Sequence, residues 1–352
     1  MLIQIGRAKQ TLHDRGSQPS TFEGKKPGLL QAFWGGLTNL VCQRPVLAIF
    51  QACLRCNSSC GYCNLPLNVG RYEMSREEIR QVFTGLYREG VRFVFMQGGE
   101  PLLRKDLVPI LQDLVQIGFH ITLITNGTRL TESLVQTFDA LAVTLSISLD
   151  TLDPLTYERI RGADQLDHVL AGLKLLEGYR HPKFLTCIVS EINRQEVTQM
   201  VRFAQERGFL PVVGAYHWDV GLYGKQEPLL MYEREQARAV FEGLLKENAL
   251  PPGYLRQYAK DNVAWLSGET LSPCDAGRYS IAIDASGHVS PCLSLPEAGN
   301  LLESSLSEIL ARFDRQAIQR CSDRSSCNRL DGRVIGSVLR HPIAAWQTPV
   351  QW

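Results

Sequence analysis

Six short apolar runs alternate with helical segments between Pro45 and Tyr216, and this alternation limits the possible folds more than any other feature of the chain. Each run has the length of a strand, and the segments between them carry apolar residues at helical spacing. The runs cover residues 46–51, 91–96, 119–125, 142–149, 184–190 and 209–216. Strand–helix units in series predict an α/β fold with a parallel sheet, curled into a full or partial barrel. We therefore expect the active site at the carboxyl ends of the strands.

The fourth run differs from the others because polar and apolar residues alternate along it. Thr144, Ser146, Ser148 and Asp150 share one face of this strand, and the residues between them are apolar. A parallel strand buried on both sides is usually apolar throughout. The polar face therefore predicts a cavity that holds a polar ligand, and an exposed antiparallel strand is the alternative.

Beyond residue 217 the alternation ends. A helix is predicted over residues 232–250, and the Pro251-Pro252-Gly253 segment ends it. Residues 279–284 and 288–292 predict a small hairpin, and a further helix is predicted over residues 301–320.

Charge and hydropathy exclude several classes of protein. Thirty-seven Lys and Arg against 36 Asp and Glu give a formal net charge of +1, so a nucleic-acid partner is not indicated. No run of 18 apolar residues could form a transmembrane helix, and the N-terminus lacks the apolar core of a secretory signal, so we expect a cytoplasmic protein. Residues 29–41 predict an amphipathic helix packed under the main domain. Its polar face lacks Lys and Arg, so peripheral membrane contact is not favoured.

Ten cysteines are present, and their placement is more informative than their number. Five lie between Cys42 and Cys63, four lie between Cys274 and Cys327, and Cys187 stands alone between these groups. In a reducing compartment, thiols grouped in this way indicate metal sites rather than disulfides.

The first group places three thiols directly after the first predicted strand, as Cys56-x3-Cys60-x2-Cys63. Closely spaced thiolates on a loop can bind three irons of an iron–sulfur cube and leave the fourth iron open to another ligand. Zinc is the alternative, because Cys53 completes a C-x2-C-x3-C-x2-C series. Zinc sites of this type usually join two distant pairs of cysteines, so the short separation here favours an iron–sulfur cluster.

This loop, with Tyr62 before its last cysteine, resembles the signature of the radical S-adenosylmethionine (radical SAM) superfamily. The second run ends in Gly98-Gly99-Glu100-Pro101, which resembles the GGE motif of that superfamily. The likeness covers about residues 45–216 and continues through residues 125–127, 146–150, 157–162 and 191–193.

The resemblance implies a partial (β/α)6 TIM-like barrel in which Cys56, Cys60 and Cys63 ligate a [4Fe–4S] cluster. SAM would bind the fourth iron through its amino and carboxylate groups. The implied SAM-binding residues are Tyr62 near the adenine, Gly98, Gly99 and Glu100 at the ammonium, Ser148 and Asp150 near the ribose, and Asn193. Reductive cleavage of SAM would give a 5′-deoxyadenosyl radical that abstracts a substrate hydrogen, with an electron from an external reductant such as flavodoxin or ferredoxin.

The second cysteine group resembles the start of a SPASM or Twitch extension, the auxiliary-cluster module of some radical SAM enzymes. Cys274-Asp-Ala-Gly277 and Asp284-x2-Gly287-x4-Cys292 carry this likeness. The resemblance implies a small α+β auxiliary-cluster domain whose second [4Fe–4S] cluster has four ligands: Cys274, Cys292, Cys321 and Cys327. Four cysteines suffice for one cluster, which favours the shorter Twitch type. Structural zinc is the alternative, and an open iron in the auxiliary cluster is left undecided.

The chain is thus expected to divide into a tail with the amphipathic helix (1–44), the radical SAM core (45–216), a connector (217–273) and the auxiliary-cluster domain (274–352). Cys187 is a tempting hydrogen-atom donor. Thr186 and Ser190 share the opposite face of that strand, however, so we expect Cys187 to pack outward against helices. The role of Cys53 is open. Residues 216–223 follow the sixth strand, where a substrate should lie, although ordinary loop packing explains their aromatic content equally.

Three functions are compared on this basis. The favoured one is a radical SAM enzyme acting on a small molecule by oxidation, epimerisation or bond formation. The second is a maturase of a ribosomally made peptide, which the short segment of about 44 residues before the first strand disfavours. The third is a non-enzymatic iron–sulfur electron carrier or zinc scaffold, against which the GGE motif and the polar-faced strand argue, since a carrier needs no cofactor cavity.

Overall fold

A parallel sheet forms the centre of the computed structural model, which describes residues 36–65, 69–218 and 225–347. The six predicted strands pair in parallel in chain order: β1 (Leu47–Gln51), β2 (Phe93–Gln97), β3 (His120–Thr125), β4 (Thr144–Ser148), β5 (Lys183–Val189) and β6 (Leu210–Ala215). The helices between them are α2 (Arg76–Arg88), α3 (Leu107–Ile117), α4 (Glu132–Ala140), α5 (Pro154–Arg161), α6 (Leu166–Leu175) and α7 (Val197–Glu206). The predicted α/β alternation is confirmed.

Helix α2 shows how local sequence signals position these elements. The hydroxyl of Ser75 accepts a hydrogen bond from the backbone N–H of Glu78, and the Glu78 carboxylate accepts one from the N–H of Ser75. This capping box satisfies two of the amides left free at a helix start. The helix buries Ile79 and Phe83 against the sheet, and Gly90 follows its end with a φ of +94°.

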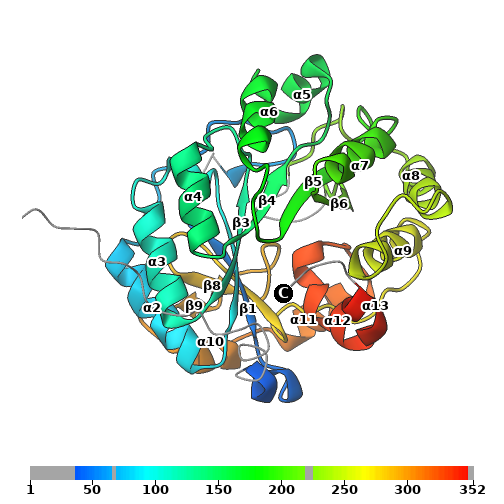
Figure 1. Cartoon of the computed structure of the whole chain (residues 1–352). Helices are drawn as coiled ribbons and strands as arrows, with labels where there is room; N and C mark the ends of the chain where they lie inside the picture. Colours follow the sequence, from blue (N-terminus) through cyan, green and yellow to red (C-terminus); the bar gives the residue numbers. More distant parts are fainter. Residues whose placement is uncertain (1–35, 66–68, 219–224, 348–352) are drawn as a thin grey trace, which may run out of the picture.

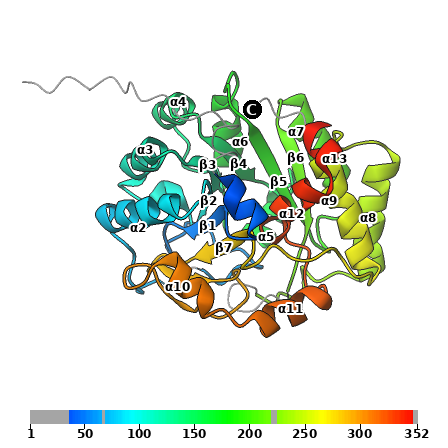
Figure 2. The same cartoon turned by 90° about the horizontal axis from the view of Figure 1, so that it is seen from below.

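The barrel is open between β1 and β6, which lie at separate positions in one sheet of order β6-β5-β4-β3-β2-β1-β7-β8-β9. Figure 1 shows that the C-terminal helices α12 (Val334–Arg340) and α13 (Pro342–Gln347) lie on this open side, between β1 and α9 (Tyr254–Leu266), and Figure 2 shows the same arrangement from below. Helix α9 packs on β6 and α13, and α8 (Arg234–Lys246) packs on α9.

The C-terminal part extends the central sheet. Strand β7 (Ser280–Ile283) pairs in parallel with β1, and β8 (His288–Ser290) and β9 (Gly299–Asn300) follow as antiparallel strands. The predicted hairpin is therefore confirmed, and its first strand joins the barrel sheet.

One predicted helix, over residues 301–320, is wrong as a single element. The structure has α10 (Leu306–Ala311) and α11 (Arg315–Asp323) instead. The chain turns between them because Phe313 enters the core and Asp314 caps the second helix, where its carboxylate accepts the N–H of Ala317 at 2.9 Å.

Strands β2 and β3 have one buried face and one half-buried face. Along β2, for example, Val94 and Met96 are buried against the helices, while Phe93 and Phe95 line an internal cavity of about 980 Å³. Thr144 and Ser146 of β4 line the same cavity, so the polar face of this strand borders a cavity as predicted, and the polar ligand stays a prediction.

Part of the predicted N-terminal helix lies in the described residues. Residues 36–41 are helical, and Gly36 and Leu40 line the cavity at the end opposite the cysteine loop. Residues 29–35 lie outside the part of the chain that is described.

Candidate iron–sulfur and SAM site

The first cysteine group lies on the loop after β1, and neighbouring segments hold the loop backbone on two sides. On one side, the N–H groups of Gly99 and Glu100 donate to the carbonyls of Cys53 and Arg55 at 2.8 and 2.7 Å. On the other side, the N–H of Ser59 donates to the Arg161 carbonyl at 3.0 Å. The loop therefore has a fixed backbone course before any ligand binds.

Glycine is required where these segments meet. A Cβ at Gly98 would lie 2.4 Å from the carbonyl oxygen of Cys53, and one at Gly99 would lie 2.1 Å from that of Arg55. Gly162, with a φ of +65°, approaches Ser59 just as closely. The paired glycines of the GGE segment thus have a packing role against the cysteine loop.

The thiols of this loop accept backbone hydrogen bonds. The N–H of Ser58 donates to Sγ of Cys56 at 3.4 Å, and the N–H of Leu65 donates to the thiol of Cys63 in the same i+2 pattern. Burial raises the pKa of Cys56 to about 11, and this hydrogen bond opposes the rise. Such N–H donors stabilise thiolate sulfur bound to iron, so the loop suits a cluster.

Cys53 has a different environment from these thiols. It is buried, and its S–H donates to the carbonyl of Glu100 at 3.3 Å. Burial raises the pKa of Cys53 to about 12, which favours the protonated thiol. These features set Cys53 apart from a set of metal ligands.

The spacing of the thiols bears on the zinc alternative. Tetrahedral zinc with Zn–S bonds of about 2.3 Å holds neighbouring sulfurs about 3.8 Å apart. Across the described ranges, no three cysteine sulfurs lie within 4.8 Å of one another.

A buried ion pair lies beside the loop. Asp150 follows β4, and its Oδ2 is 2.7 Å from Nη2 of Arg161 and accepts the hydroxyl of Tyr62 at 3.1 Å. Its Oδ1 accepts the N–H of Ile188 at 2.8 Å. The Arg161 guanidinium also lies over the Tyr62 ring, 5.5 Å from its centroid. Burial lowers the pKa of Arg161, but Asp150 together with the neighbouring Tyr and Cys side chains outweighs burial, and the net pKa lies above its usual range.

Three further predicted residues lie at the same edge of the sheet. The buried carboxylate of Glu100 accepts hydrogen bonds from Thr125, Asn126 and Leu102, at 2.5 to 3.0 Å. Asn193 is fully buried and donates to the carbonyls of Asp150 and Ile188, both at 2.9 Å. The hydrogen bonds of both side chains thus join the ends of neighbouring strands. Ser148, the last residue of β4, is half-buried.

The second cysteine group converges on one small cavity, which Cys274, Cys292, Cys321 and Cys327 all line. The i+2 pattern recurs here, because the N–H of Ser294 donates to Sγ of Cys292 at 3.4 Å and Ala276 donates to Cys274. Burial raises the pKa of Cys274, Cys292 and Cys327 to about 11 each. These four thiols therefore resemble the first group in both grouping and hydrogen bonding.

An ion pair separates the two cysteine groups. Arg329 and Asp331 line both the large cavity and the small cysteine-lined one. They contact each other through two hydrogen bonds, at 3.2 and 3.0 Å. The positive charge of Arg329 lowers the pKa of thiols in both groups, namely Cys63 in the first and Cys292 and Cys327 in the second, and so opposes the effect of burial.

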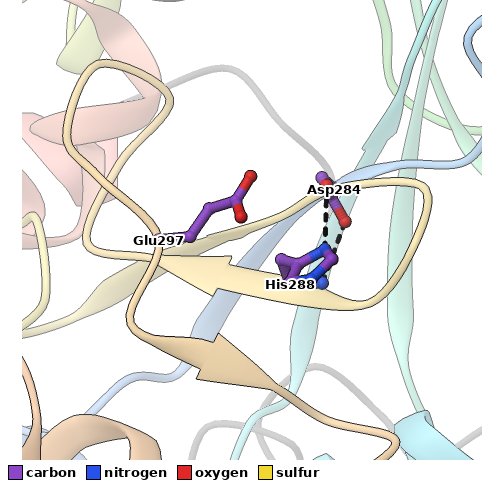
Figure 3. Close-up of side chains that lie close together, drawn as sticks. All are labelled: Asp284, His288 and Glu297. Carbon is purple, nitrogen blue, oxygen red and sulfur yellow. Dashed lines mark hydrogen bonds and ion pairs between the residues drawn. The ribbon is translucent and has the colours of Figure 1, made fainter. Parts of the chain in front are cut away.

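A third cluster of side chains that could ligate a metal joins the β7–β8 hairpin to the segment before β9 and contains no cysteine (Figure 3). Asp284, His288 and Glu297 bring three ligand atoms within 4.8 Å of one another. Asp284 Oδ1 accepts the N–H groups of Ser286 and His288, both at 2.9 Å, and its Oδ2 is 3.4 Å from Nδ1 of His288. Glu297 is exposed. The Asp284-x2-Gly287 segment thus forms the hairpin turn.

The segment after β6 contributes aromatic rings. Tyr62 lies 6.2 Å from Tyr216, which lies 5.5 Å from Trp218, measured between ring centroids. Burial lowers the pKa of His217 to about 4, and Arg329 acts in the same direction. Residues 219–224 of this predicted substrate segment lie outside the described residues.

Cys187 is buried in the core as expected, and Thr186 on the opposite face of β5 lines the cavity. Two residues near the cysteine groups received no role from the sequence, namely Arg161 and Arg329. Arg161 belongs to the segment of residues 157–162 that resembles the family, and Arg329 follows Cys327 by two positions. These two positions are the signals by which the sequence could have indicated a role for each residue.

Comparison with known proteins identifies two family models in this chain. Residues 52–204 match the radical SAM superfamily, and residues 274–330 match an iron–sulfur cluster-binding domain named SPASM. Helices in the described part are all too short or too polar to span a membrane.

Among relatives, a probable GTP 3′,8-cyclase of Methanothermobacter marburgensis is 35% identical over 158 residues, which cover 44% of this chain and 52% of the cyclase. The chain thus spans about half the length of that relative. The PqqA peptide cyclase of Rhizobium meliloti is 28% identical over 289 residues, covering 75% of this chain and 73% of the cyclase.

The fold is similar to that of Streptococcus suis SuiB bound to precursor peptide SuiA, with a TM-score of 0.61, 18% identity, and coverage of 81% of this chain and 70% of that one. Both family matches agree with the order of the strands and with the positions of the two cysteine groups. Residues 52–204 of this chain thus form a radical SAM domain, and residues 274–330 form a C-terminal SPASM domain that binds an iron–sulfur cluster.

Proposed function

We propose that this enzyme cleaves SAM reductively and uses the product to abstract a hydrogen atom from a substrate in the barrel cavity. The observation that carries this proposal is the loop of Cys56, Cys60 and Cys63, whose backbone is held on two sides at the carboxyl ends of a parallel sheet, beside a large cavity. A [4Fe–4S] cluster bound there supplies one-electron reduction of the SAM sulfonium.

The chain's own residues would bind and orient SAM. Tyr62 lines the cavity and is held by Asp150, so its ring is a fixed surface for the adenine. Ser148 and Asp150 end β4 and are assigned to the ribose side. Gly98 and Gly99 bring backbone carbonyls close to the cysteine loop, where they can accept hydrogen bonds from the SAM ammonium. Glu100 and Asn193 would maintain this edge through their buried hydrogen bonds.

The second group of thiols is assigned to one auxiliary [4Fe–4S] cluster, with Cys274, Cys292, Cys321 and Cys327 as ligands. Their common cavity and recurring N–H donors support this assignment. All ten cysteines are free thiols, which agrees with a cytoplasmic location and an external one-electron reductant.

Anaerobic reconstitution tests the proposal. The wild type should bind about eight irons per chain and release 5′-deoxyadenosine when reduced with SAM present. Cys60→Ala should abolish cleavage, and Cys292→Ala should keep cleavage while it loses about half of the iron. Cys53→Ala and Cys42→Ala are matched controls that should retain both. Equal loss of cleavage in Cys60→Ala and Cys53→Ala would contradict the ligand assignment.

A peptide substrate is the second candidate, favoured by the similarity to the PqqA peptide cyclase over most of this chain. A small-molecule substrate is supported by the position of the cavity between the strands on one side and α9, α12 and α13 on the other. Binding of a synthetic peptide encoded beside this gene would favour the maturase function.

A further inference from the structure

We propose that the substrate is an elongated amphiphile, with an apolar body along the barrel cavity and a small uncharged polar end beside Arg329 and Asp331. This inference names the substrate class of the site above and so rests on the proposed function. The cavity is called the lumen below.

The lumen extends along the full length of the strands. Its wall includes Leu47 and Gln51, the first and last residues of β1, and likewise Phe93 and Gln97 of β2. Four steps of about 3.3 Å give a length of at least about 13 Å. Gly36 extends the lumen further at the amino-terminal end. SAM bound beside Tyr62 would lie at the carboxyl end of the lumen.

The wall is mostly apolar, and the side chains of the described residues leave the lumen unfilled. Phe93, Phe95, Ile124 and Phe184 line the lumen and are half-buried, although they lie inside the molecule. In a closed barrel, inward side chains of this kind fill the interior. Water in an apolar cavity finds few hydrogen-bond partners, so such cavities tend to stay dry and to bind apolar molecules. An apolar ligand body would complete the burial of these residues.

An ion pair stands in the otherwise mostly apolar wall of the lumen. Arg329 pairs with Asp331 through Nε and Nη2, and its Nη1 has no hydrogen bond to any described residue. Gln51, another residue of the wall, is buried, and its Oε1 has no partner among described residues. The ion pair is neutral as a unit and offers both donors and acceptors, so it suits a hydroxyl better than a full anion.

A series of straight-chain primary alcohols from hexanol to dodecanol tests this inference on the reconstituted enzyme, with calorimetric binding as the readout. We expect affinity to rise about fourfold for each added methylene until the lumen is full, and then to level off. Dodecanol should bind more tightly than dodecanoate, and Asp331→Asn should reverse that order by removing the negative charge.

A side chain that fills part of the lumen should shorten the longest alcohol that the lumen can hold. Thr144→Phe places a large side chain on the lumen face of β4, and the affinity plateau should move to a shorter alcohol. Thr122→Phe on β3 is a second such variant, and Thr270→Phe at an exposed position is the control. Iron content and thermal unfolding show whether each variant is folded.

The outcomes separate this inference from the proposed function. An affinity independent of chain length, or a plateau unmoved in both folded lumen variants, would overturn the amphiphile inference while SAM binding stayed intact. If the wild type fails to bind SAM, the proposed function fails, whatever the alcohols do.

Discussion

Replacement of Gly99 by alanine tests whether the GGE segment supports the cysteine loop by direct backbone contact. The added Cβ would lie 2.1 Å from the carbonyl oxygen of Arg55 and 2.7 Å from that of Leu54. Both contacts are to backbone atoms, so no side-chain rotation can relieve them. Overpacking costs about 1–3 kcal/mol, and we expect the upper end of that range here. The loop must shift, which should also reduce iron retention.

The assay combines urea unfolding of the iron-free protein with iron content after reconstitution. Gly85→Ala in α2 is the matched control, because a Cβ there would have no neighbour within 4 Å. Alanine at this helical position should stabilise the protein by about 0.5–1 kcal/mol. If Gly99→Ala unfolds at the wild-type urea concentration and binds wild-type iron, the proposed contact between the two segments is refuted.

Three further predictions concern buried charges. Asp150→Asn should destabilise the iron-free protein by about 3–5 kcal/mol, because it leaves Arg161 buried without its partner; Glu242→Gln, in an exposed pair, should cost at most about 0.5 kcal/mol in the same urea titration. Arg329→Gln should shift the reduction potentials of both clusters to more negative values in an EPR-monitored titration, since reduction adds negative charge beside the lost cation, whereas exposed Arg324→Gln should shift neither. His217 has a pKa of about 4 in the folded protein and 6.5 in the unfolded chain. Between pH 6.5 and pH 4 the unfolded chain therefore binds one proton more than the folded protein, and the free energy of unfolding should fall as the pH falls through this range. The loss is about 3 kcal/mol relative to His217→Gln, and parallel pH profiles of the two proteins would disprove it.

The barrel strands were predictable because each is a short apolar run between helical segments, and because their order along the chain is their order in the sheet. The addition of β7 to the edge of β1 was not predictable, since the pairing joins residues 280–283 to residues 47–50 across more than 200 positions. The turn at Phe313 and Asp314 was missed because the apolar spacing continues through it, and only the burial of Phe313 shows where the chain turns.

For the site, the cysteine groups were visible as spacing, but the residues around them were not. Arg329 lies two positions after Cys327 in the sequence, but tertiary packing alone brings Arg161 beside the first cysteine group and places Arg329 between the two groups. Glu100 was expected at the SAM ammonium, and the structure adds that three donors of the chain already bind its carboxylate. The open lumen was signalled only by the polar face of β4.

The central claim is that Cys56, Cys60 and Cys63 hold a cluster with one iron left for SAM, and the EPR spectrum of the reduced, anaerobically reconstituted protein tests it most directly. Addition of SAM should change the signal of one cluster in the wild type and in Cys53→Ala, and should change nothing in Cys60→Ala. Protein that contains zinc in place of iron, or an iron–sulfur signal that is identical with and without SAM, would contradict the claim.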